Sequence, residues 1–337
     1  MICTRIVIMF FFSTVVSYGI SNKSLSNTSC RKPYYQMVFM NKGKLNMIEQ
    51  GNISRSCNWL NGCKRERKLC WKKRGLAQVL WNARKLALEY CKSQFRYDQW
   101  NCALKMKYFK DIYRETAYMQ AIAAASLMYS IAVACSQGQL HGCKCAEHVK
   151  SQGGTKWHWG GCSHNIKFAR KFAKRFLGIK SNENGLTRLI NFNSEIGFRS
   201  IQNNIERKCF RVSDSCSVET CWKSLKPFDR ISVELKNQYH TAISVNTTNT
   251  VNHLNIGNSL HKLMYIKPTL NLCQSTTGRR CNNTDNCATL CCGRGFFSKT
   301  IELVYFCNCG WRDQAVFTSD SLVCEQCSKN QNIFVCK

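Results

Sequence analysis

Acidic residues are scarce in this sequence, and their scarcity argues against several kinds of catalysis. The 337 residues include 19 aspartates and glutamates against 49 lysines and arginines. This shortage disfavours a site built on paired catalytic carboxylates. The sequence also lacks the Gly-x-Ser-x-Gly motif of hydrolases and a glycine-rich phosphate-binding loop. We therefore expect that the protein is not an enzyme.

Long hydrophobic runs are also few. The apolar run from Ile6 to Val16 follows Arg5 and precedes the small-x-small pattern Ser17-Tyr18-Gly19. It is much shorter than the roughly 20 residues that a membrane-spanning helix needs. We therefore expect a cleaved secretory signal peptide over residues 1–19, and hence export of the chain. The second apolar stretch, Ala117 to Ala134, contains several polar residues and favours a buried core helix over a membrane span.

Cysteine, in contrast, is abundant. The chain has 24 cysteines, of which Cys3 lies in the signal peptide, so that 23 remain in the mature protein. This density is typical of a disulfide scaffold in an oxidising compartment. The odd number requires at least one unpaired cysteine or one that pairs with another molecule.

Some spacings resemble metal or redox sites. Zinc ligands could be drawn from four residues, Cys143, Cys145, His141 and His148, and Cys324-x-x-Cys327 resembles a redox motif. Cysteines of an exported chain are far more often oxidised to disulfides. The sequence therefore predicts structural cysteines and no metal or cofactor.

The glycosylation sequons and the net charge indicate where the protein acts and what kind of partner it binds. Five Asn-x-Ser/Thr sequons suit the secretory route, at Asn22, Asn27, Asn52, Asn246 and Asn282. The formal net charge of +30 favours a polyanionic partner, although it also serves solubility. For an exported chain, heparan sulfate or another sulfated glycosaminoglycan is a better candidate than nucleic acid.

Two folded regions are expected, one mainly helical and one rich in cystine and strands. The boundaries are as follows: a signal peptide at 1–19, a basic glycosylated arm at 20–70, a helical domain at 71–242, a linker at 243–262 and a C-terminal domain at 263–337. The linker is rich in Asn, Thr and Ser, and the last region holds ten cysteines. Within it, the run 301–306 suggests a strand.

Helical periodicity dominates the middle of the chain. Apolar residues recur at three- and four-residue spacing over Leu76–Tyr90, after Cys162 and over Phe228–Tyr239. The helix after Cys162 has apolar and basic faces: Ile166, Ala169, Phe172 and Phe176 on one, and Lys167, Arg170, Lys171, Lys174 and Arg175 on the other. Such a basic amphipathic helix suits heparan sulfate or lipid headgroups as well as ordinary core packing.

A short cysteine loop carries the main candidate for modification. Cys209 and Cys216 flank Ser213, and Cys221-Trp222 follows. A bond between Cys209 and Cys216 would hold Ser213 near the tip of a hairpin.

The segment RKCFRVSDSCSVETCW at 207–222 resembles the acylation hairpin of Wnt proteins, CKCHG-x-SGSC-x-x-KTCW. Four other segments resemble Wnt motifs in the same order: RETAYMQAIAAAS at 114–126, KWHWGGCSHNIKFARKFAKRF at 156–176, LINFNSEIGFRS at 189–200 and CNNTDNCATLCCGRGF at 281–296. Cys57 to Cys70 resembles the cysteine-bearing arm of the family. On these motifs the chain resembles a divergent member of the Wnt family.

The resemblance implies a fold and a set of disulfides. The fold is α+β and disulfide-rich, with a helical domain that bears a lipid-carrying hairpin at 209–221 and a small cystine-rich β C-terminal domain. The implied pairs are Cys91–Cys102, Cys135–Cys143, Cys145–Cys162, Cys209–Cys216, Cys273–Cys292, Cys281–Cys287, Cys291–Cys336, Cys307–Cys327 and Cys309–Cys324.

The resemblance also implies a function. Porcupine would attach a monounsaturated fatty acyl group to Ser213, and Wntless would carry the lipidated ligand outward. The chain would then bind the Frizzled cysteine-rich domain and a lipoprotein-receptor-related coreceptor from the extracellular space or matrix, at the cell surface. The implied receptor-binding residues are Val212, Ser213, Trp311, Val316 and Phe317.

The hairpin departs from the family pattern at several positions. Arg207 replaces the first cysteine, so that Cys221 is expected to lose its partner or to pair within the arm. Asp214 replaces the glycine after the serine, and Ser215 is the alternative acceptor. Two other functions stay open: a secreted glycosaminoglycan-binding or matrix protein without receptor signalling, and a secreted hydrolase that uses Ser213.

Overall fold

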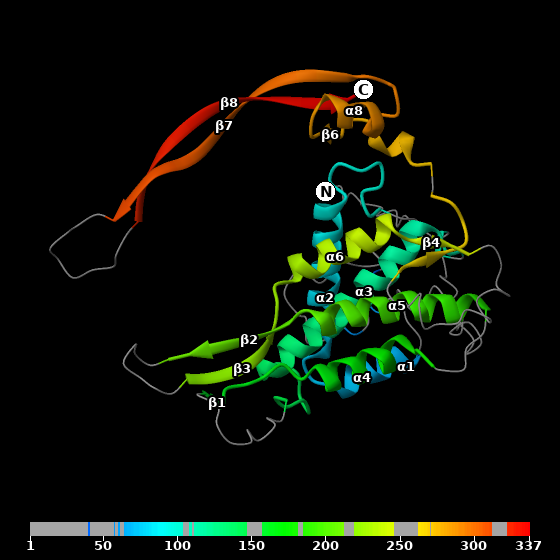
Figure 1. Ribbon diagram of the computed structural model, residues 1–337, viewed down its shortest axis with the longest axis vertical. Helices are drawn as coiled ribbons and strands as arrows, with labels where there is room; N and C mark the ends of the chain where they lie inside the picture. The colour runs from blue at the N-terminus through cyan, green and yellow to red at the C-terminus, as the bar shows by residue number, and fades with distance from the viewer. Residues whose placement is uncertain are drawn as a thin grey trace, which may run out of the picture.

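The computed structural model describes residues 40, 57, 60, 64–103, 108–109, 111–146, 157–180, 185–211, 219–245, 262–269, 271–311 and 322–337. A helical region comes first along the chain and a strand-rich region follows it (Figure 1). Ten disulfides join cysteines of the described part. The expected α+β, disulfide-rich fold is confirmed.

The helices are α1 Lys64–Lys72, α2 Leu76–Gln94, α3 Arg114–Ser136, α4 Ile166–Leu177, α5 Gly185–Asn203, α6 Phe228–His240, the 3-10 turn η6 Cys273–Thr276 and α8 Thr284–Leu290. The strands are β1 Trp157–Trp159, β2 Ile205–Phe210, β3 Glu219–Leu225, β4 Ile243–Ser244, β5 Met264–Tyr265, β6 Arg280–Cys281, β7 Phe296–Trp311 and β8 Leu322–Cys336. They form three small sheets, in the orders β1-β3-β2, β4-β5 and β6-β8-β7.

Helix α3 is the centre of the helical region. It is long and apolar enough to cross a membrane by length and composition, but 83% of its most apolar window is buried inside the protein. Helices α2, α4, α5 and α6 all pack against it. Because a helix that is apolar on every side needs neighbours on every side, the prediction of a core helix is confirmed.

Helices α3 and α5 approach each other closely at Gly197. A Cβ atom added there would lie 2.0 Å from the carbonyl oxygen of Ala121. Both backbones are therefore in near contact, and only glycine fits between them. Other small side chains of α3, such as Ala124 and Ala125, are fully buried.

Gly197→Ala is expected to destabilise the protein by about 1–3 kcal/mol, because the extra methyl group forces two packed backbones apart. Thermal unfolding of the purified secreted protein measures this effect. Gly310→Ala is the matched control, since a Cβ at Gly310 meets no atom within 4 Å. Equal melting temperatures for the two variants would contradict the close helix contact.

The three predicted amphipathic helices are present as α2, α4 and α6. In α4 the apolar face is buried through Ala169, Phe172 and Phe176. The helix begins where the Asn165 side chain accepts a hydrogen bond from the amide of Phe168 at 3.0 Å, and it ends at Gly178 with φ 71°. On its basic face, Arg170 and Lys174 form ion pairs with Glu195 of α5.

Helix α5 was not predicted from periodicity, because polar residues share its buried face. Asn191, Asn193 and Ser194 are all buried there. The amide of Asn193 donates to the backbone carbonyl of Met264 at 2.9 Å and accepts from the amide of Met264 at 3.0 Å. A buried asparagine is stable in this position because both ends of its amide are paired.

Two predicted boundaries differ from the structure. Helix α1 continues across residue 70, where the arm was expected to end, and the helix itself was not predicted. Strand β5 pairs in parallel with β4, and Met264 packs against Ile112 and Leu189 of the helical region. Residues 263–266 therefore belong to the helical region, although the predicted C-terminal domain began at 263.

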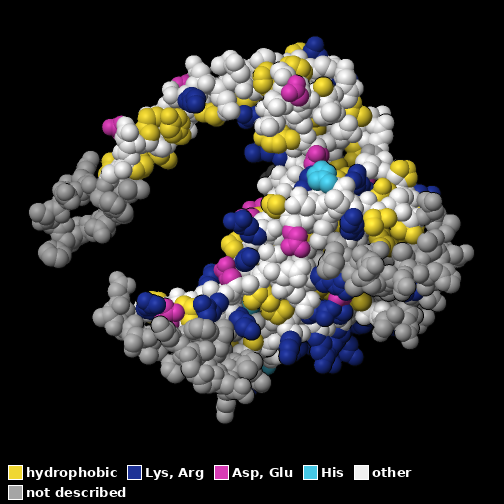
Figure 2. Space-filling model, viewed as in Figure 1, with side chains coloured by type: hydrophobic (Ala, Val, Ile, Leu, Met, Phe, Trp, Pro, Cys, Tyr) yellow, Lys and Arg dark blue, Asp and Glu magenta, His cyan; other side chains and the backbone are white. Residues whose placement is uncertain are grey.

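Two hairpins project toward the same side of the molecule, one from the helical region and the other from the C-terminal region beside β6 and α8 (Figure 1). The first hairpin is β2–β3, and the second hairpin is the long ribbon β7–β8. Figure 2 shows an open space between them. The structure thus has two separate extensions that face a common gap.

Candidate functional site

The first hairpin frames the segment with the predicted acylation site. Strands β2 and β3 are antiparallel, and Cys209 lies directly opposite Cys221. The intervening residues 212–218 lie outside the described residues, and with them Val212, Ser213, Asp214, Ser215 and Cys216. The described part therefore defines the two strands that hold this loop.

One predicted disulfide in this hairpin is wrong. Cys209 is bonded to Cys221, with 4.1 Å between their Cα atoms, and not to Cys216. The physical reason is the strand register, which brings residues 209 and 221 face to face across the ladder. Cys221 thus keeps a partner within the hairpin, contrary to expectation, and Cys216 loses the one that the family resemblance assigned to it.

Nine further disulfides join cysteines of the described part. Eight coincide with pairs that the resemblance implied: Cys91–Cys102, Cys135–Cys143, Cys145–Cys162, Cys273–Cys292, Cys281–Cys287, Cys291–Cys336, Cys307–Cys327 and Cys309–Cys324. The ninth, Cys57–Cys70, was not assigned from the sequence. Since Cys143 and Cys145 are both oxidised, neither supplies a thiolate to zinc in this structure.

An ion pair closes the described end of the first hairpin. The last paired residues of the two strands are Phe210 and Thr220. Just beyond them, the guanidinium group of Arg211 forms an ion pair with the carboxylate of Glu219. The family pattern has glycine and lysine at these two positions. The neck of the loop is therefore held by one disulfide and one ion pair. Beside it, Phe210 leaves 61% of its surface exposed.

The loop after β1 supports the base of the first hairpin. Strand β1 runs parallel to β3, and the Ser163 hydroxyl accepts a hydrogen bond from the amide of Lys223 at 2.9 Å. The amide of Leu225 donates to Nδ1 of His164 at 3.1 Å. The pKa of His164 is lowered from its ordinary value of 6.5, first by burial and then by the nearby charge of Lys208.

Acidification is expected to loosen the base of the first hairpin. Because its pKa is lowered on folding, neutral His164 contributes stability above pH 6.5, and this contribution is lost as the pH falls through the lowered value. A protonated ring also cannot accept the Leu225 hydrogen bond. Hydrogen exchange at the Leu225 amide, corrected for the intrinsic rate, should be faster at pH 5 than at pH 7. His164→Asn, which keeps an acceptor that does not titrate, should remove the difference, and a difference that persists in this variant would contradict the role of His164.

The second hairpin is longer and more apolar on its surface. Its exposed apolar side chains are Phe297, Leu303, Val304, Tyr305, Phe306 and Val323. Two disulfides cross it, Cys307–Cys327 and Cys309–Cys324, on either side of a register shift at Asn308, which has φ 49°. Trp311 is the last residue of β7, and its backbone pairs with Leu322. The predicted contacts Val316 and Phe317 lie outside the described residues.

Sequence reasoning missed the exposed apolar residues along this ribbon and named only its tip. Alternate residues of a strand point to opposite faces. Leu303 and Tyr305 therefore lie on one face, and Val304 and Phe306 on the other. The signal was present in the run 301–306, where apolar residues occupy both faces of the ribbon. Strand β6, the third strand of this sheet, pairs with residues 334–335 of β8 and not with the part of β8 that lies opposite this run.

A small disulfide core anchors the second hairpin to the helical region. Cys281, Cys287, Leu290, Cys291 and Cys336 form this core. The adjoining Arg279 donates to the backbone carbonyls at three positions of the turn after α2, Phe95, Arg96 and Gln99, at 3.3, 2.9 and 2.8 Å. A guanidinium group suits this task because it offers five fixed donors.

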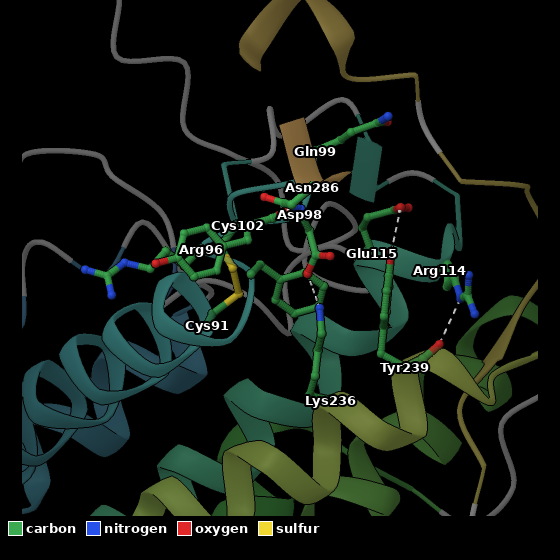
Figure 3. A network of polar contacts seen from close by, with 12 residues as sticks. Cys91, Arg96, Asp98, Gln99, Cys102, Arg114, Glu115, Lys236, Tyr239 and Asn286 are labelled. Atoms are coloured by element: carbon green, nitrogen blue, oxygen red, sulfur yellow. Dashed lines mark hydrogen bonds and ion pairs between the residues drawn. A yellow bond between two sulfur atoms is a disulfide. The ribbon is translucent and has the colours of Figure 1, made fainter. Parts of the chain in front are cut away.

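A polar network that includes residues of α3 and α6 supports the turn after α2 (Figure 3). Lys236 of α6 forms an ion pair with Asp98, and the hydroxyl of Tyr239 donates to Glu115 at 3.2 Å. Burial lowers the pKa of Lys236, and the hydrogen bond to Asp98 opposes this shift. Arg114 donates to the carbonyl of Tyr239 at 2.8 Å. The turn is therefore a firm support for the C-terminal domain.

Asn282 is the one predicted glycosylation site within the described residues. Its side chain is exposed and lies two residues before the start of α8. The other four predicted sites, Asn22, Asn27, Asn52 and Asn246, lie outside the described residues, as does the expected signal peptide. Exposure of Asn282 is compatible with a bulky sugar at this position.

Comparison with known proteins finds relatives over most of the chain. A sequence model of the wnt family matches residues 59–337. The chain is 30% identical over 311 residues to Protein Wnt-4 of Drosophila melanogaster, and the match covers 86% of this chain and 57% of that protein. It is 32% identical over 308 residues to Protein Wnt-9a of Gallus gallus, with coverage of 83% and 86%. The chain thus spans little more than half of the fly relative but most of the chicken one.

A solved structure shows the same fold. The solved structure of human WLS in complex with WNT8A contains a chain that is similar to this one, with a TM-score of 0.59 and 25% sequence identity. The match covers 82% of this chain and 96% of that chain. The similarity therefore includes most of the helical and strand-rich regions.

Proposed function

This chain belongs to the Wnt family of signalling ligands, and we propose that it is secreted, acylated on Ser213 and recognised by the cysteine-rich domain of a Frizzled receptor. One observation supports this most. The first and second hairpins project from the same side of the molecule and leave an open space between them (Figure 2). A receptor domain held from two sides would fit such a space.

The first contact in this proposal is the acyl chain on Ser213. The neck formed by the Cys209–Cys221 disulfide and the Arg211–Glu219 ion pair holds the loop at both ends. A fatty chain buries roughly 0.8 kcal/mol per methylene group. The ordering of the loop and the association itself then reduce the net gain. The exposed Phe210 beside the neck adds an apolar surface next to the chain.

The second contact is the tip of the second hairpin, with Trp311, Val316 and Phe317. Exposed apolar residues on an extended ribbon favour a protein interface, since isolated ribbons rarely keep them in water without a partner. Leu303 to Phe306 continue this apolar character toward the base of the ribbon. A lipoprotein-receptor-related coreceptor is the further extracellular partner in this proposal.

Export would require two further partners. Porcupine is the proposed acyltransferase for Ser213. Wntless is the proposed carrier, because the chain in the complex of human WLS with WNT8A shares the fold of this one. The exposed Asn282 and the disulfides suit this route through an oxidising compartment.

The second candidate function is binding to a sulfated glycosaminoglycan without receptor signalling. It is favoured by the exposed basic residues of α4, namely Lys167, Lys171 and Arg175. Arg170 and Lys174, which were also predicted for this face, are instead paired with Glu195. Binding to heparan sulfate is also compatible with signalling, and we propose it as an accessory interaction in the extracellular matrix.

A binding experiment separates these two functions. Protein secreted from animal cells is captured on an immobilised Frizzled cysteine-rich domain, and the peptide with Ser213 is analysed by mass spectrometry. Acylation together with capture supports the ligand. An unmodified peptide without capture, from protein that still binds heparin, would favour the glycosaminoglycan-binding protein. Esterase activity that is lost in Ser213→Ala would instead support a hydrolase.

A further inference from the structure

The disulfide core that anchors the second hairpin brings sulfur atoms of two different disulfides together. Cys281 is bonded to Cys287, and Cys291 is bonded to Cys336. The Sγ atom of Cys281 lies 3.6 Å from Sγ of Cys291 and 4.0 Å from Sγ of Cys336. These three sulfur atoms all lie within 4.8 Å of one another, and we call them the sulfur trio. The core thus places a third sulfur atom beside the Cys291–Cys336 bond.

The backbone around the sulfur trio holds it in place. Strand β6, which carries Cys281, pairs with β8 just before Cys336, and α8 lies beside them at the base of the second hairpin (Figure 1). The amide of Cys336 donates to the carbonyl of Arg279 at 2.9 Å. The amide of Cys291 donates to the carbonyl of Cys287 at 2.9 Å, at the end of α8. Backbone hydrogen bonds therefore keep these cysteines close together in addition to the disulfides.

Three cysteine sulfurs at this spacing could bind a metal ion only as thiolates. Each sulfur of the trio is instead part of a disulfide. A disulfide sulfur reacts with a neighbouring thiolate, because a new sulfur–sulfur bond forms as the old one breaks. The sulfur trio therefore suits thiol–disulfide exchange better than metal binding.

From this geometry we propose that the sulfur trio is a site of thiol–disulfide exchange, with a thiol or dithiol as its co-reactant. In the first step the thiolate of the co-reactant attacks Sγ of Cys287. A bond forms between these two sulfurs, the Cys281–Cys287 bond breaks, and Cys281 leaves as a thiolate. Because Cys287 is buried, the co-reactant reaches it only when the short helix α8 opens, so the site stays closed in the resting protein.

In the second step the Cys281 thiolate attacks Sγ of Cys291, which is the nearer sulfur of the second disulfide. The Cys281–Cys291 bond forms, the Cys291–Cys336 bond breaks, and Cys336 leaves as a thiolate. The number of disulfides is unchanged in both steps, so the exchange needs no oxidant.

The exchange moves the covalent anchor of the second hairpin. In the structure, the Cys291–Cys336 bond ties the residue after α8 to the last residue of β8. After the exchange, the Cys281–Cys291 bond ties the same residue to β6, and the end of β8 is held by backbone hydrogen bonds. The base of the second hairpin is therefore loosened, while both disulfides at its far end stay closed. This inference does not depend on acylation or on receptor binding.

Cys287→Ser leaves Cys281 as a thiol and so takes the place of the first step. The protein secreted from animal cells is blocked with maleimide and mapped without reduction. Protease cleavage separates the three sulfurs of the trio onto three peptides, with cuts before Asp285 and after Arg294 and Lys329. We expect Cys281 to be linked to the peptide of Cys291, and Cys336 to carry at least about tenfold more maleimide than in the control variant. A retained Cys291–Cys336 link, with maleimide on Cys281, would overturn the proposal.

Cys324→Ser is the matched control. It frees Cys309, which belongs to no such group of sulfurs within the part of the chain that the structure describes. Here Cys309 should carry the maleimide, and the Cys291–Cys336 link should stay. Non-native links as frequent as those in Cys287→Ser would show general scrambling of the disulfides and overturn the exchange site.

The unaltered protein provides a second test, which does not require a variant to be secreted. It is incubated with reduced glutathione, blocked with maleimide and mapped in the same way, and fragmentation locates each label. Exchange predicts glutathione on Cys287 and maleimide on Cys336, while Cys281 stays linked. Maleimide on Cys281 with an intact Cys291–Cys336 bond, or glutathione on Cys291 in place of Cys287, would overturn the proposal. A core in which glutathione modifies no cysteine would overturn it too, because the site would then lack its co-reactant.

Discussion

Ser213→Ala is expected to remove the acyl group and to weaken binding to the Frizzled cysteine-rich domain by at least about 100-fold. The reason is the size of the lost contact. Burial of a long fatty chain contributes on the order of 10 kcal/mol before the costs of association are subtracted. A loss of 100-fold corresponds to only about 2.7 kcal/mol, so this expectation leaves a wide margin. Capture on the immobilised receptor domain, with mass spectrometry of the loop peptide, provides the measurement.

Ser215→Ala is the matched control for this result. Ser215 lies in the same loop and carries the same side chain, but it is only the alternative acceptor. It should retain both the acyl group and receptor binding. If the acyl group is found on Ser215, or if Ser213→Ala binds the receptor domain as tightly as the unaltered protein, the assignment of the acyl group to Ser213 is wrong.

The second large effect concerns the hairpin disulfide. Cys221→Ser is expected to destabilise the protein by about 2–5 kcal/mol and to reduce its secretion severely, because the Cys209–Cys221 bond closes the loop at its neck. Cys221 is also fully buried, so the substitution leaves a hydroxyl that is withdrawn from water. The secreted yield and the thermal unfolding of the purified protein measure this effect.

Cys216→Ser distinguishes the two possible pairings. If Cys209 pairs with Cys221, the Cys216 variant is secreted normally and a non-reducing peptide map shows the Cys209–Cys221 link. If Cys209 instead pairs with Cys216, the outcomes are reversed: Cys216→Ser impairs secretion and Cys221→Ser is tolerated. Because the two substitutions are chemically identical, the comparison isolates the pairing itself.

Periodicity predicted those helices whose buried faces are apolar. Helix α4 is the clearest example, since Ala169, Phe172 and Phe176 recur at helical spacing and are all buried. Helix α5 escaped prediction because Asn191, Asn193 and Ser194 lie on its buried face. Their burial depends on partners such as the backbone of Met264, which is distant in sequence. Such partners cannot be identified from a local pattern.

The candidate site, too, could be predicted only in part from the sequence. The motif around Ser213 identified the hairpin. The disulfide partner of Cys209 depends on the strand register, which places Cys221 opposite it, and the register could not be identified from the motif. The hairpin of the family has two disulfides, and the resemblance suggested that the one closing the shorter loop, Cys209–Cys216, is kept.

The three hydrogen bonds from Arg279 also have a mechanical consequence. Strand β7 has 16 residues, and at roughly 3.3 Å per residue it is about 50 Å long. A rotation of about 5° at the Arg279 joint therefore moves the far end of the ribbon by roughly 4 Å, which is similar to the spacing of adjacent strands. The second hairpin therefore acts as a lever. The width of the opening between the two hairpins depends on this joint, where α8 makes two further hydrogen bonds with the same turn.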